Sequence, residues 1–406
     1  MAFERPPSWR TMFRKVHLWL GIGLALLIVP ITLTGLVLVF DDEIDEVLNP
    51  SFYATTGTAV ARPADEYMQG ASEAVGGRAA MLRWPNGEGR PVTVMVRLQP
   101  PPSAVERKLD GERGTNRSGR PEGQAGNRRP PSRLVYLDPP TGAVLGIKDF
   151  RNSLIGQVHV FHENLMVPEY SGRAIVGWTG VALLLLSLTG LVLWLPRNAR
   201  LVRAFAWRRG PTMSINLHHL AGFWISIPLG LMALTGIVLA FPPQASAVLN
   251  AFDTPQPPVR RTGADPLMPH PALTAERAIE IGKDAAEPET PRMLAAPSIT
   301  TRAWRLEVEA PDGTRHSISI DDATGQATLE RPPRRGDVIG TWMRRVHEGR
   351  SHGPIWATLA GLCGVLPTLL AITGVLMWLR KRRNKAALRG GTSALTNSRL
   401  MPAESA

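Results

Sequence analysis

Four long apolar runs stand out along a chain that is otherwise rich in polar residues. They cover residues 16–40, 174–195, 217–241 and 355–379, and none of them contains Asp, Glu, Lys or Arg. A helix rises about 1.5 Å per residue, so each run is long enough to cross a hydrocarbon core of roughly 30 Å. The pattern predicts an α-helical integral membrane protein with four transmembrane helices.

The two long connections between these runs, residues 41–173 and 242–354, carry shorter patterns. Each connection contains one predicted helix followed by two stretches in which polar and apolar residues alternate, as they do in strands. The helices cover 65–75 and 274–286, and the strands cover 91–98, 134–138, 303–309 and 316–321. The connections are therefore expected to form two small α+β domains.

Residues 99–133 separate the two predicted strands of the first connection. They are rich in Arg, Pro and Gly and contain few apolar residues. A segment of this composition buries too little apolar surface to offset the entropy of ordering. We expect a disordered insert rather than a binding site.

The chain contains two copies of one arrangement. His17 precedes Thr34 by seventeen residues, and His218 precedes Thr235 by the same number. In the other two runs the spacing is longer: His162 precedes Thr189 by 27 residues, and His347 precedes Thr373 by 26. The repeat unit is a helix, an outer segment and a second helix. The threonines are expected to bond to carbonyls of their own helices or across to a neighbour, with no catalytic role.

Charge gives the expected orientation. The net charge is +12 and the isoelectric point is near 10.7, but the basic residues gather in 1–15, 197–213 and 380–406. The first apolar run is followed by an acidic stretch, Asp41-Asp42-Glu43, without a small-residue cleavage site, so it is expected to be an uncleaved anchor. The positive-inside tendency places both termini in the cytoplasm. The basic charge then reflects topology, and no binding of nucleic acid is predicted.

Four histidines lie at the start of an apolar run or ahead of it, and the orientation sorts them into two pairs. We name His17 with His218 the inner pair, and His162 with His347 the outer pair, after their predicted sides of the membrane. Histidine near lipid is costly without a partner or a role. Interfacial histidines can instead cap helix ends, but four in repeat register favour axial ligation of two b-type haems, one per pair.

Some ligand choices stay open at this stage. His159 lies one helical turn ahead of His162 and is its rival, and His219 is the rival of His218. The single cysteine, Cys363, allows no C-x-x-C-H attachment, so haem would be held without a covalent bond. Glycines near the histidines are expected to let the flat ring approach the backbone: Gly21, Gly23, Gly172, Gly177 and Gly222.

These motifs together resemble the PepSY-associated transmembrane helix family of bacterial inner-membrane proteins. The segments that carry the resemblance are His17-x3-Gly21, Leu33-Thr-Gly35, Phe161-His162, Leu188-Thr-Gly-Leu-Val-Leu-Trp-Leu-Pro196, His218-x3-Gly222, Leu234-Thr-Gly236, Val346-His347-Glu-Gly349 and Ile372-Thr-Gly-Val-Leu-Met-Trp378. The resemblance covers nearly the whole chain. It implies that the outer connections are PepSY-like domains in the periplasm.

The resemblance also implies a function, because members are associated with iron-siderophore uptake and some resemble di-haem reductases. The expected activity is reduction of a ferric siderophore or other Fe(III) chelate. Since no Gly-rich dinucleotide motif is visible, the donor would be external, either a cytoplasmic reductase or quinol. A non-redox alternative is a membrane protein whose PepSY-like domains bind or inhibit a partner, or assist siderophore transport.

The expected organisation follows. It comprises a cytoplasmic arm (1–15), a first span (16–40), a periplasmic PepSY-like domain (41–157), an outer histidine segment with the second span (158–196), a cytoplasmic loop (197–213), a third span (214–241), a second periplasmic PepSY-like domain (242–340), an outer histidine segment with the fourth span (341–379) and a cytoplasmic tail (380–406).

Overall fold

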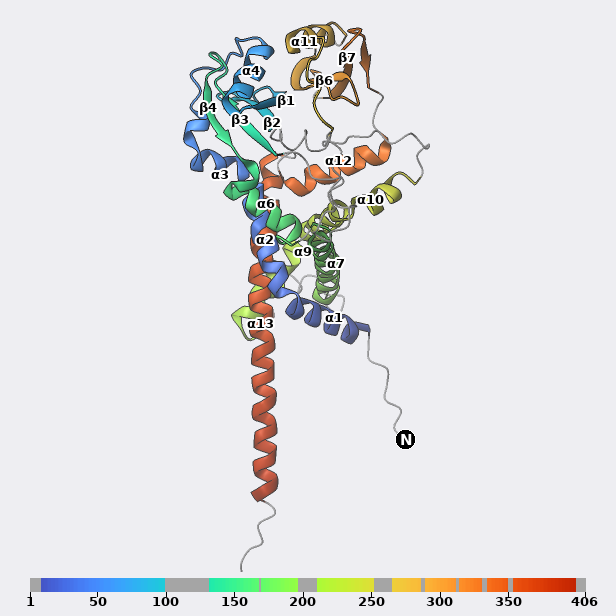
Figure 1. Ribbon diagram of the computed structural model, residues 1–406. Coiled ribbons are helices and arrows are strands. Elements are labelled where there is room, and N and C mark those ends of the chain that lie inside the picture. Colours follow the sequence, from blue (N-terminus) through green and yellow to red (C-terminus); the bar gives the residue numbers. More distant parts are fainter. Residues whose placement is uncertain are drawn as a thin grey trace, which may run out of the picture. The chain divides into compact units, whose positions relative to one another are not determined.

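The computed structural model describes most of the chain, which divides into two compact units. The described residues are 9–98, 131–167, 169–195, 210–251, 265–285, 289–311, 314–330, 334–349 and 353–398. Unit 1 is helical and holds residues 1–41, 157–253 and 333–406, and unit 2 holds residues 42–156 and 254–332. Figure 1 shows the elements of both.

Unit 1 is built from helices that differ widely in length. They are α1 (Trp9–Gly23), α2 (Ala25–Val39), α6 (Leu154–Asn164), α7 (Glu169–Trp194), α9 (Met213–Ala240), α10 (Pro242–Leu249), α12 (Arg335–Glu348) and α13 (Gly353–Ser398). α7 packs along α9, and α13 packs against both α2 and α9. Among the described residues, three stretches are long and apolar enough to cross a membrane: Ser171–Trp194, Met213–Ala240 and Gly353–Ala387.

The fourth expected span is not one straight helix. α1 and α2 together pass the same test, but they meet at a bend of 69°. The break falls at Leu24, directly after Gly21 and Gly23. Glycine is the least favourable helix former after proline, so two of them weaken this turn. The expectation of a continuous helix over residues 16–40 was therefore wrong, and the bend turns α1 away from the direction of α2.

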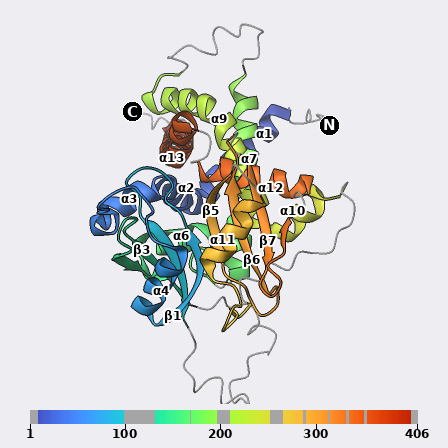
Figure 2. The ribbon, with the colours of Figure 1, turned by 90° about the horizontal axis from the view of Figure 1, so that it is seen from above.

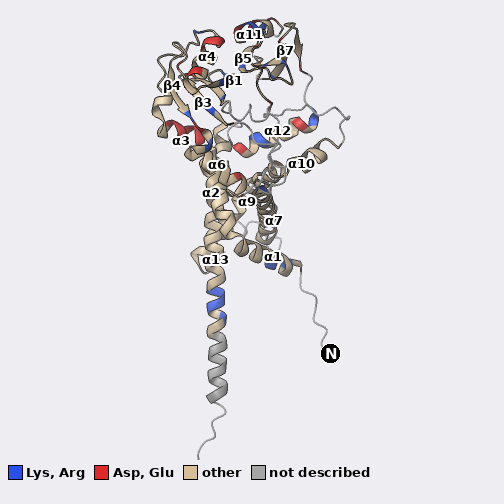
Figure 3. Cartoon of the chain, viewed as in Figure 1, with Lys and Arg blue, Asp and Glu red and all other residues tan. Residues whose placement is uncertain are grey.

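Basic residues flank the apolar helices of unit 1, before the first apolar run and after the last. Figure 3 shows Lys and Arg on α1 and on α13 beyond its apolar stretch. The described ones are Arg10, Arg14, Lys15, Arg380, Lys381, Arg382, Arg383 and Lys385. The predicted cytoplasmic loop 197–213 lies largely outside the described residues, which resume at Gly210.

Unit 2 contains a single eight-stranded antiparallel sheet. The strands are β1 (Gly77–Arg83), β2 (Val92–Leu98), β3 (Ser132–Leu137), β4 (Val144–Lys148), β5 (Thr290–Ala295), β6 (Ala303–Glu309), β7 (Arg315–Asp321) and β8 (Ala327–Leu329). Their order is β4-β3-β2-β1-β5-β6-β7-β8, so each outer connection supplies four adjacent strands. The two connections do not form separate domains, because β1 pairs with β5 and joins them edge to edge.

One face of the sheet is covered by α4 (Ala64–Val75) and α11 (Ala275–Asp284), as Figures 1 and 2 show. The core between helices and sheet is apolar. Its most deeply buried side chains include Tyr67, Leu82, Val92, Val94, Val135, Leu137, Ile279, Leu294, Leu306, Ile318 and Ile320. The inward residues alternate along β2 and β6, as the sequence pattern predicts.

The two helices cap each other. The carboxylate of Asp65 in α4 accepts the backbone N–H groups of Ala275 (2.7 Å) and Glu276 (3.1 Å). In return, the Glu276 carboxylate accepts the N–H of Ala64 at 2.7 Å. Carboxylates at helix N-termini satisfy unpaired N–H groups and favour the helix dipole. The two halves are thus joined at their helices as well as at the β1–β5 edge.

Three short helical elements flank the four strands of the first connection in the sequence. They are α3 (Asp41–Leu48) and two 3-10 helices, η1 (Pro50–Tyr53) and η3 (Phe150–Asn152). Asp45 of α3 is buried, and it forms an ion pair with Lys148 of β4 at 2.6 Å. The predicted insert 99–133 lies outside the described residues as far as 130, whereas Ser132 and Arg133 begin β3 and were wrongly assigned to it.

Candidate functional site

The structure brings each predicted histidine pair together, and both pairs lie within unit 1. The ring centres of His17 in α1 and His218 in α9 are 6.3 Å apart, with ring planes at 88°. Those of His162 in α6 and His347 in α12 are 6.2 Å apart, with planes at 45°. Four side chains far apart in the sequence therefore meet in the predicted twos.

The spacing of the rings suits opposed ligands on one metal ion. An imidazole nitrogen lies about 2 Å from a metal it binds and about 1 Å from its own ring centre, so two opposed imidazoles have ring centres roughly 6 Å apart. Both pairs match this value. Aromatic contact alone would allow ring centres anywhere from about 4.5 to 7 Å apart. The nearly equal distances in the two pairs therefore favour one common role for both.

Each histidine is held by a threonine of a neighbouring helix. The Nδ1 atoms of His17 and His218 lie 3.0 Å from the hydroxyl oxygens of Thr189 and Thr373, respectively. For the outer pair, Nδ1 of His162 lies 3.2 Å from Thr34 Oγ1, and Nδ1 of His347 lies 3.1 Å from Thr235 Oγ1. The four repeated threonines are thus the partners of the four repeated histidines.

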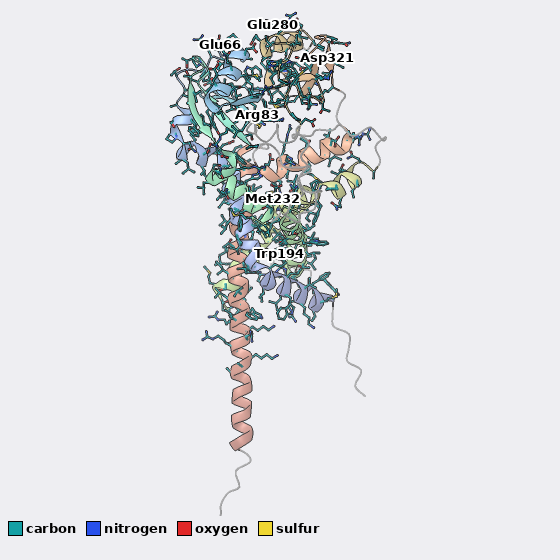
Figure 4. The ribbon with its side chains drawn as sticks, in the orientation of Figure 1. Glu66, Arg83, Trp194, Met232, Glu280 and Asp321 are labelled. Carbon is teal, nitrogen blue, oxygen red and sulfur yellow. The ribbon has the colours of Figure 1, made fainter. Side chains whose placement is uncertain are left out.

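The outer pair also contacts backbone carbonyls. Nδ1 of His162 lies 2.9 Å from the carbonyl oxygen of Ile31, and Nδ1 of His347 lies 3.1 Å from that of Met232, which Figure 4 labels. A carbonyl oxygen can only accept, so the proton of each ring is on Nδ1. The Nε2 atom of the neutral ring then carries the free lone pair that a metal ligand needs.

Burial supports the neutral form of the outer histidines. Removal from water lowers the pKa of His162, and it lowers the pKa of His347 to about 4. Desolvation disfavours the charged form of an imidazole. Both rings are therefore neutral near pH 7, which is the form that ligates iron.

The glycine after each threonine gives the imidazole room. A Cβ added to Gly35 or Gly236 would lie 3.0 Å or 2.9 Å from Cε1 of His162 or His347. The corresponding distances to the inner rings are 3.2 Å for Gly190 with His17 and 3.5 Å for Gly374 with His218. We call each of these four Thr-Gly dipeptides, with the carbonyls one turn before it, a histidine seat.

The rings of the two rivals are not the ones that face each other across the pairs. His159 is half exposed, and its Nε2 lies 4.0 Å from the Glu163 carboxylate. His218 rather than His219 is the residue whose ring faces His17. The rings that face each other are therefore those of His17 with His218 and of His162 with His347.

Histidines meet only in twos in the described part of the chain. No group of three or more His, Cys, Asp or Glu side chains that could hold a metal ion is found among the described residues. A protein-only tetrahedral site generally needs three or four such ligands. Two opposed imidazoles instead suit a metal whose other ligands come from a macrocycle. The fit to haem thus rests on the ring spacing, the Nδ1 contacts and the glycine gaps.

A family model matches most of the chain. The model described as PepSY-associated TM region matches residues 14–392. The chain belongs to this family. No curated protein matches it. Together with the apolar helices, the match identifies a multi-pass membrane protein of the PepSY-associated TM region family that also contains a sheet unit.

Sequence reasoning missed the seats of this PepSY-associated protein. The Thr-Gly dipeptides were visible as repeats, but their glycines were not linked to the histidines. Two glycines expected to face a macrocycle serve helix packing instead, since a Cβ at Gly172 would clash with the carbonyl of Asn164 and one at Gly177 with the ring of Phe241. The equal number of paired histidines and of Leu-Thr-Gly or Ile-Thr-Gly tripeptides in the apolar runs was the signal that could have revealed the seats.

Proposed function

We propose that this protein is a di-haem b electron carrier of the bacterial inner membrane that reduces ferric chelates, of the siderophore type, on the periplasmic side. The observation that supports the proposal most strongly is the spacing of the two histidine pairs, with ring centres 6.3 Å and 6.2 Å apart. In each pair, one imidazole comes from each repeat. The sites therefore lie between the two repeats.

The protein's own groups would hold and orient the cofactor. Each imidazole is fixed by its seat through Nδ1 and offers Nε2 to iron. When bound, haem supplies a one-electron Fe(III)/Fe(II) couple at each pair. The apolar helices around the pairs would limit the access of water and help to set the reduction potential of the bound iron.

The pairs lie near opposite ends of the helical unit, which supports transfer across a membrane. α9 carries His218 of the inner pair and, seventeen residues later, Thr235, which seats a ligand of the outer pair. Seventeen residues of helix extend about 26 Å, close to the roughly 30 Å of a hydrocarbon core. Electrons would enter from a cytoplasmic reductase or quinol and leave on the outer side.

The proposed substrate is Fe(III) held by hard oxygen ligands. One electron converts it to Fe(II), which such ligands hold less tightly, so the metal can leave the chelate. The direction of transfer and the periplasmic location of unit 2 rest on the charge asymmetry of the chain and on the family resemblance. The choice of chelate belongs to the same proposal.

An absorption spectrum of the detergent-purified protein tests the proposal. We expect the bands of reduced b-type haem and two haems per chain. His218→Ala should remove the inner haem and His347→Ala the outer one, while the matched controls His219→Ala and His159→Ala keep both. After reduction with dithionite and removal of the excess, a ferric siderophore should reoxidise the protein. Colourless protein from haem-replete cells would refute the proposal and leave the non-redox alternative.

A further inference from the structure

The four histidine seats share one hydrogen-bond geometry, and this geometry affects the histidine electronically as well as holding it in place. In each seat the threonine hydroxyl donates to the carbonyl four residues before it, at 2.6–2.9 Å. The acceptors are Pro30, Leu185, Leu231 and Leu369. The hydroxyl proton is thus committed to the helix, and the oxygen is left as an acceptor for the Nδ1–H of the histidine.

A second acceptor completes each seat. The carbonyl three residues before the threonine also faces the outer rings: those of Ile31 and Met232 lie 2.9 Å and 3.1 Å from the outer Nδ1 atoms, and Leu186 and Leu370 hold the corresponding positions in the inner seats. In a helix this carbonyl lies under the side chain of the residue four positions later, because side chains lean toward the N-terminus. That residue is the seat glycine, so the absence of a side chain exposes the carbonyl to the imidazole.

Two acceptors at Nδ1 have an electronic consequence. They draw the Nδ1–H proton toward oxygen, which makes Nε2 a stronger donor to a metal. A stronger donor stabilises Fe(III) relative to Fe(II), so each seat lowers the reduction potential of the iron bound to its histidine. This consequence rests on the proposed function, because it concerns iron bound at the pairs.

We propose that Thr34, Thr189, Thr235 and Thr373 are positioning residues that set the reduction potentials of the two sites separately. The seats of Thr189 and Thr373 act on the inner pair, and those of Thr34 and Thr235 act on the outer pair. Within each repeat, the inner histidine is held by the seat on the second long helix, and the outer histidine by the seat on the first. Each repeat thus supplies one ligand and one seat to each site.

Potentiometric titration of the purified holoprotein tests this inference. Thr235→Val removes one acceptor from His347 at nearly constant volume, and we expect the outer potential to rise while the inner one stays unchanged. Thr373→Val should shift only the inner potential. The expected change in the Fe(III)/Fe(II) equilibrium is up to about tenfold, which is ~59 mV for a one-electron couple. Thr→Ser at the same positions keeps the hydroxyl and should restore the wild-type potential.

Thr179 provides a matched control. It is buried in α7 and donates to the carbonyl of Ile175 at 2.8 Å, as the seat threonines do to their own helix, and its hydrogen bond involves no histidine. Thr179→Val should leave both potentials unchanged. Where a valine variant does not fold, Thr→Ala at that position supplies the comparison with serine.

The outcomes separate this inference from the proposed function. Wild-type protein without haem refutes the proposed function and the inference together. Haem at both pairs, with Thr235→Val and Thr373→Val either without effect or shifting both potentials alike, refutes only the assignment of the threonines. Failure of serine to restore the potential also overturns it, because a packing defect rather than the lost acceptor would then be responsible.

Discussion

The inner and outer pairs use the same kind of seat, but they present their histidines on different supports. His218 lies near the start of α9, and the same continuous helix later provides the Thr235 seat of the outer pair. His347 instead lies on α12, a short helix that ends at Gly349 with a φ of +82° before α13 begins. The outer histidine His347 is thus fixed by its seat and a turn, whereas the inner histidine His218 is part of a long helix.

This difference explains the two spacings in the sequence. Seventeen residues separate a histidine from the seat threonine that follows it when one helical path carries both, as in α9, or in α1 and α2 with their bend. In the spacings of 27 and 26 residues, the histidine lies near the end of a short helix, and a turn separates it from the long helix that carries the threonine. In the first repeat this turn contains Leu165 and Met166, both with a φ of 57°. Left-handed conformations at residues other than glycine are strained, so the chain accepts a cost there to place α6.

The largest expected difference between the pairs concerns the seat glycines. Gly236→Ala would place a Cβ 2.9 Å from Cε1 of His347, so the ring must move. We expect the affinity of the outer pair for haem to fall by about tenfold or more, as it does for other changes beside a metal ligand. The matched variant Gly374→Ala places its Cβ at an ordinary 3.5 Å from His218.

Haem content per chain, measured with the spectrum of each site, checks this prediction. Gly374→Ala should keep both haems, and Gly236→Ala should keep only the inner one. Equal losses of haem in the two variants would show that the Gly236 seat leaves the ring no less room than the Gly374 seat does.

A moderate effect is expected at the turn that ends α12. Gly349 has a φ of +82°, and a Cβ there would lie 3.0 Å from the Cβ of Ala360 and 3.3 Å from Val39. Gly349→Ala should cost about 1 kcal/mol or more from the left-handed backbone, in addition to the crowding. Because His347 is two residues away, the thermal stability of the outer site should fall while the inner site is retained.

Gly353→Ala is the control for backbone strain alone. Its φ is +77°, and a Cβ there would meet nothing within 4 Å. Thermal unfolding followed at the haem band should give a lower midpoint for Gly349→Ala than for Gly353→Ala. The reverse order would show that the contact with α13 does not support the outer ligand.

A small effect is expected for the acidic residue beside an outer histidine. Glu163 follows His162 and forms an ion pair with Arg173, but both side chains are about 40% exposed. Exposed pairs typically contribute between 0 and about 1 kcal/mol. Glu163→Gln should therefore leave haem content unchanged and lower the unfolding midpoint only slightly. A loss of the outer haem would mean that this carboxylate holds the ligand helix in place.

Much of this arrangement could be predicted from the sequence, because charge-free runs and a repeated histidine are strong one-dimensional signals. The pairing of His17 with His218, and of His162 with His347, followed from charge asymmetry and the repeat. The local strand patterns at 303–309 and 91–98 correspond to β6 and β2. Short amphipathic elements such as α6 and α12 were harder to recognise, because their moderate polarity resembles that of a loop.

Long-range choices were beyond the sequence. The pairing of β1 with β5 joins residues more than 200 positions apart, and nothing in either strand specifies the other. The seats were missed for a similar reason: the role of Gly236 depends on a ring that arrives from another helix. The bend at Leu24 arises from a local weakness at Gly21 and Gly23, but such glycines occur in straight membrane helices as well.

The smallest difference requires no mutation, because the two pairs differ in ring orientation. The planes of His17 and His218 are almost perpendicular at 88°, whereas those of His162 and His347 are inclined by 45°. Axial ligands shape the electronic structure of a ferric haem, and perpendicular imidazole planes leave the two iron d orbitals that overlap them nearly equal in energy. The oxidised inner site should therefore give the more anisotropic electron paramagnetic resonance signal of the two. Loss of this signal in His218→Ala, and its retention in His347→Ala, would assign it to the inner pair. Two identical signals would mean that the seats do not maintain different ring orientations once iron is bound.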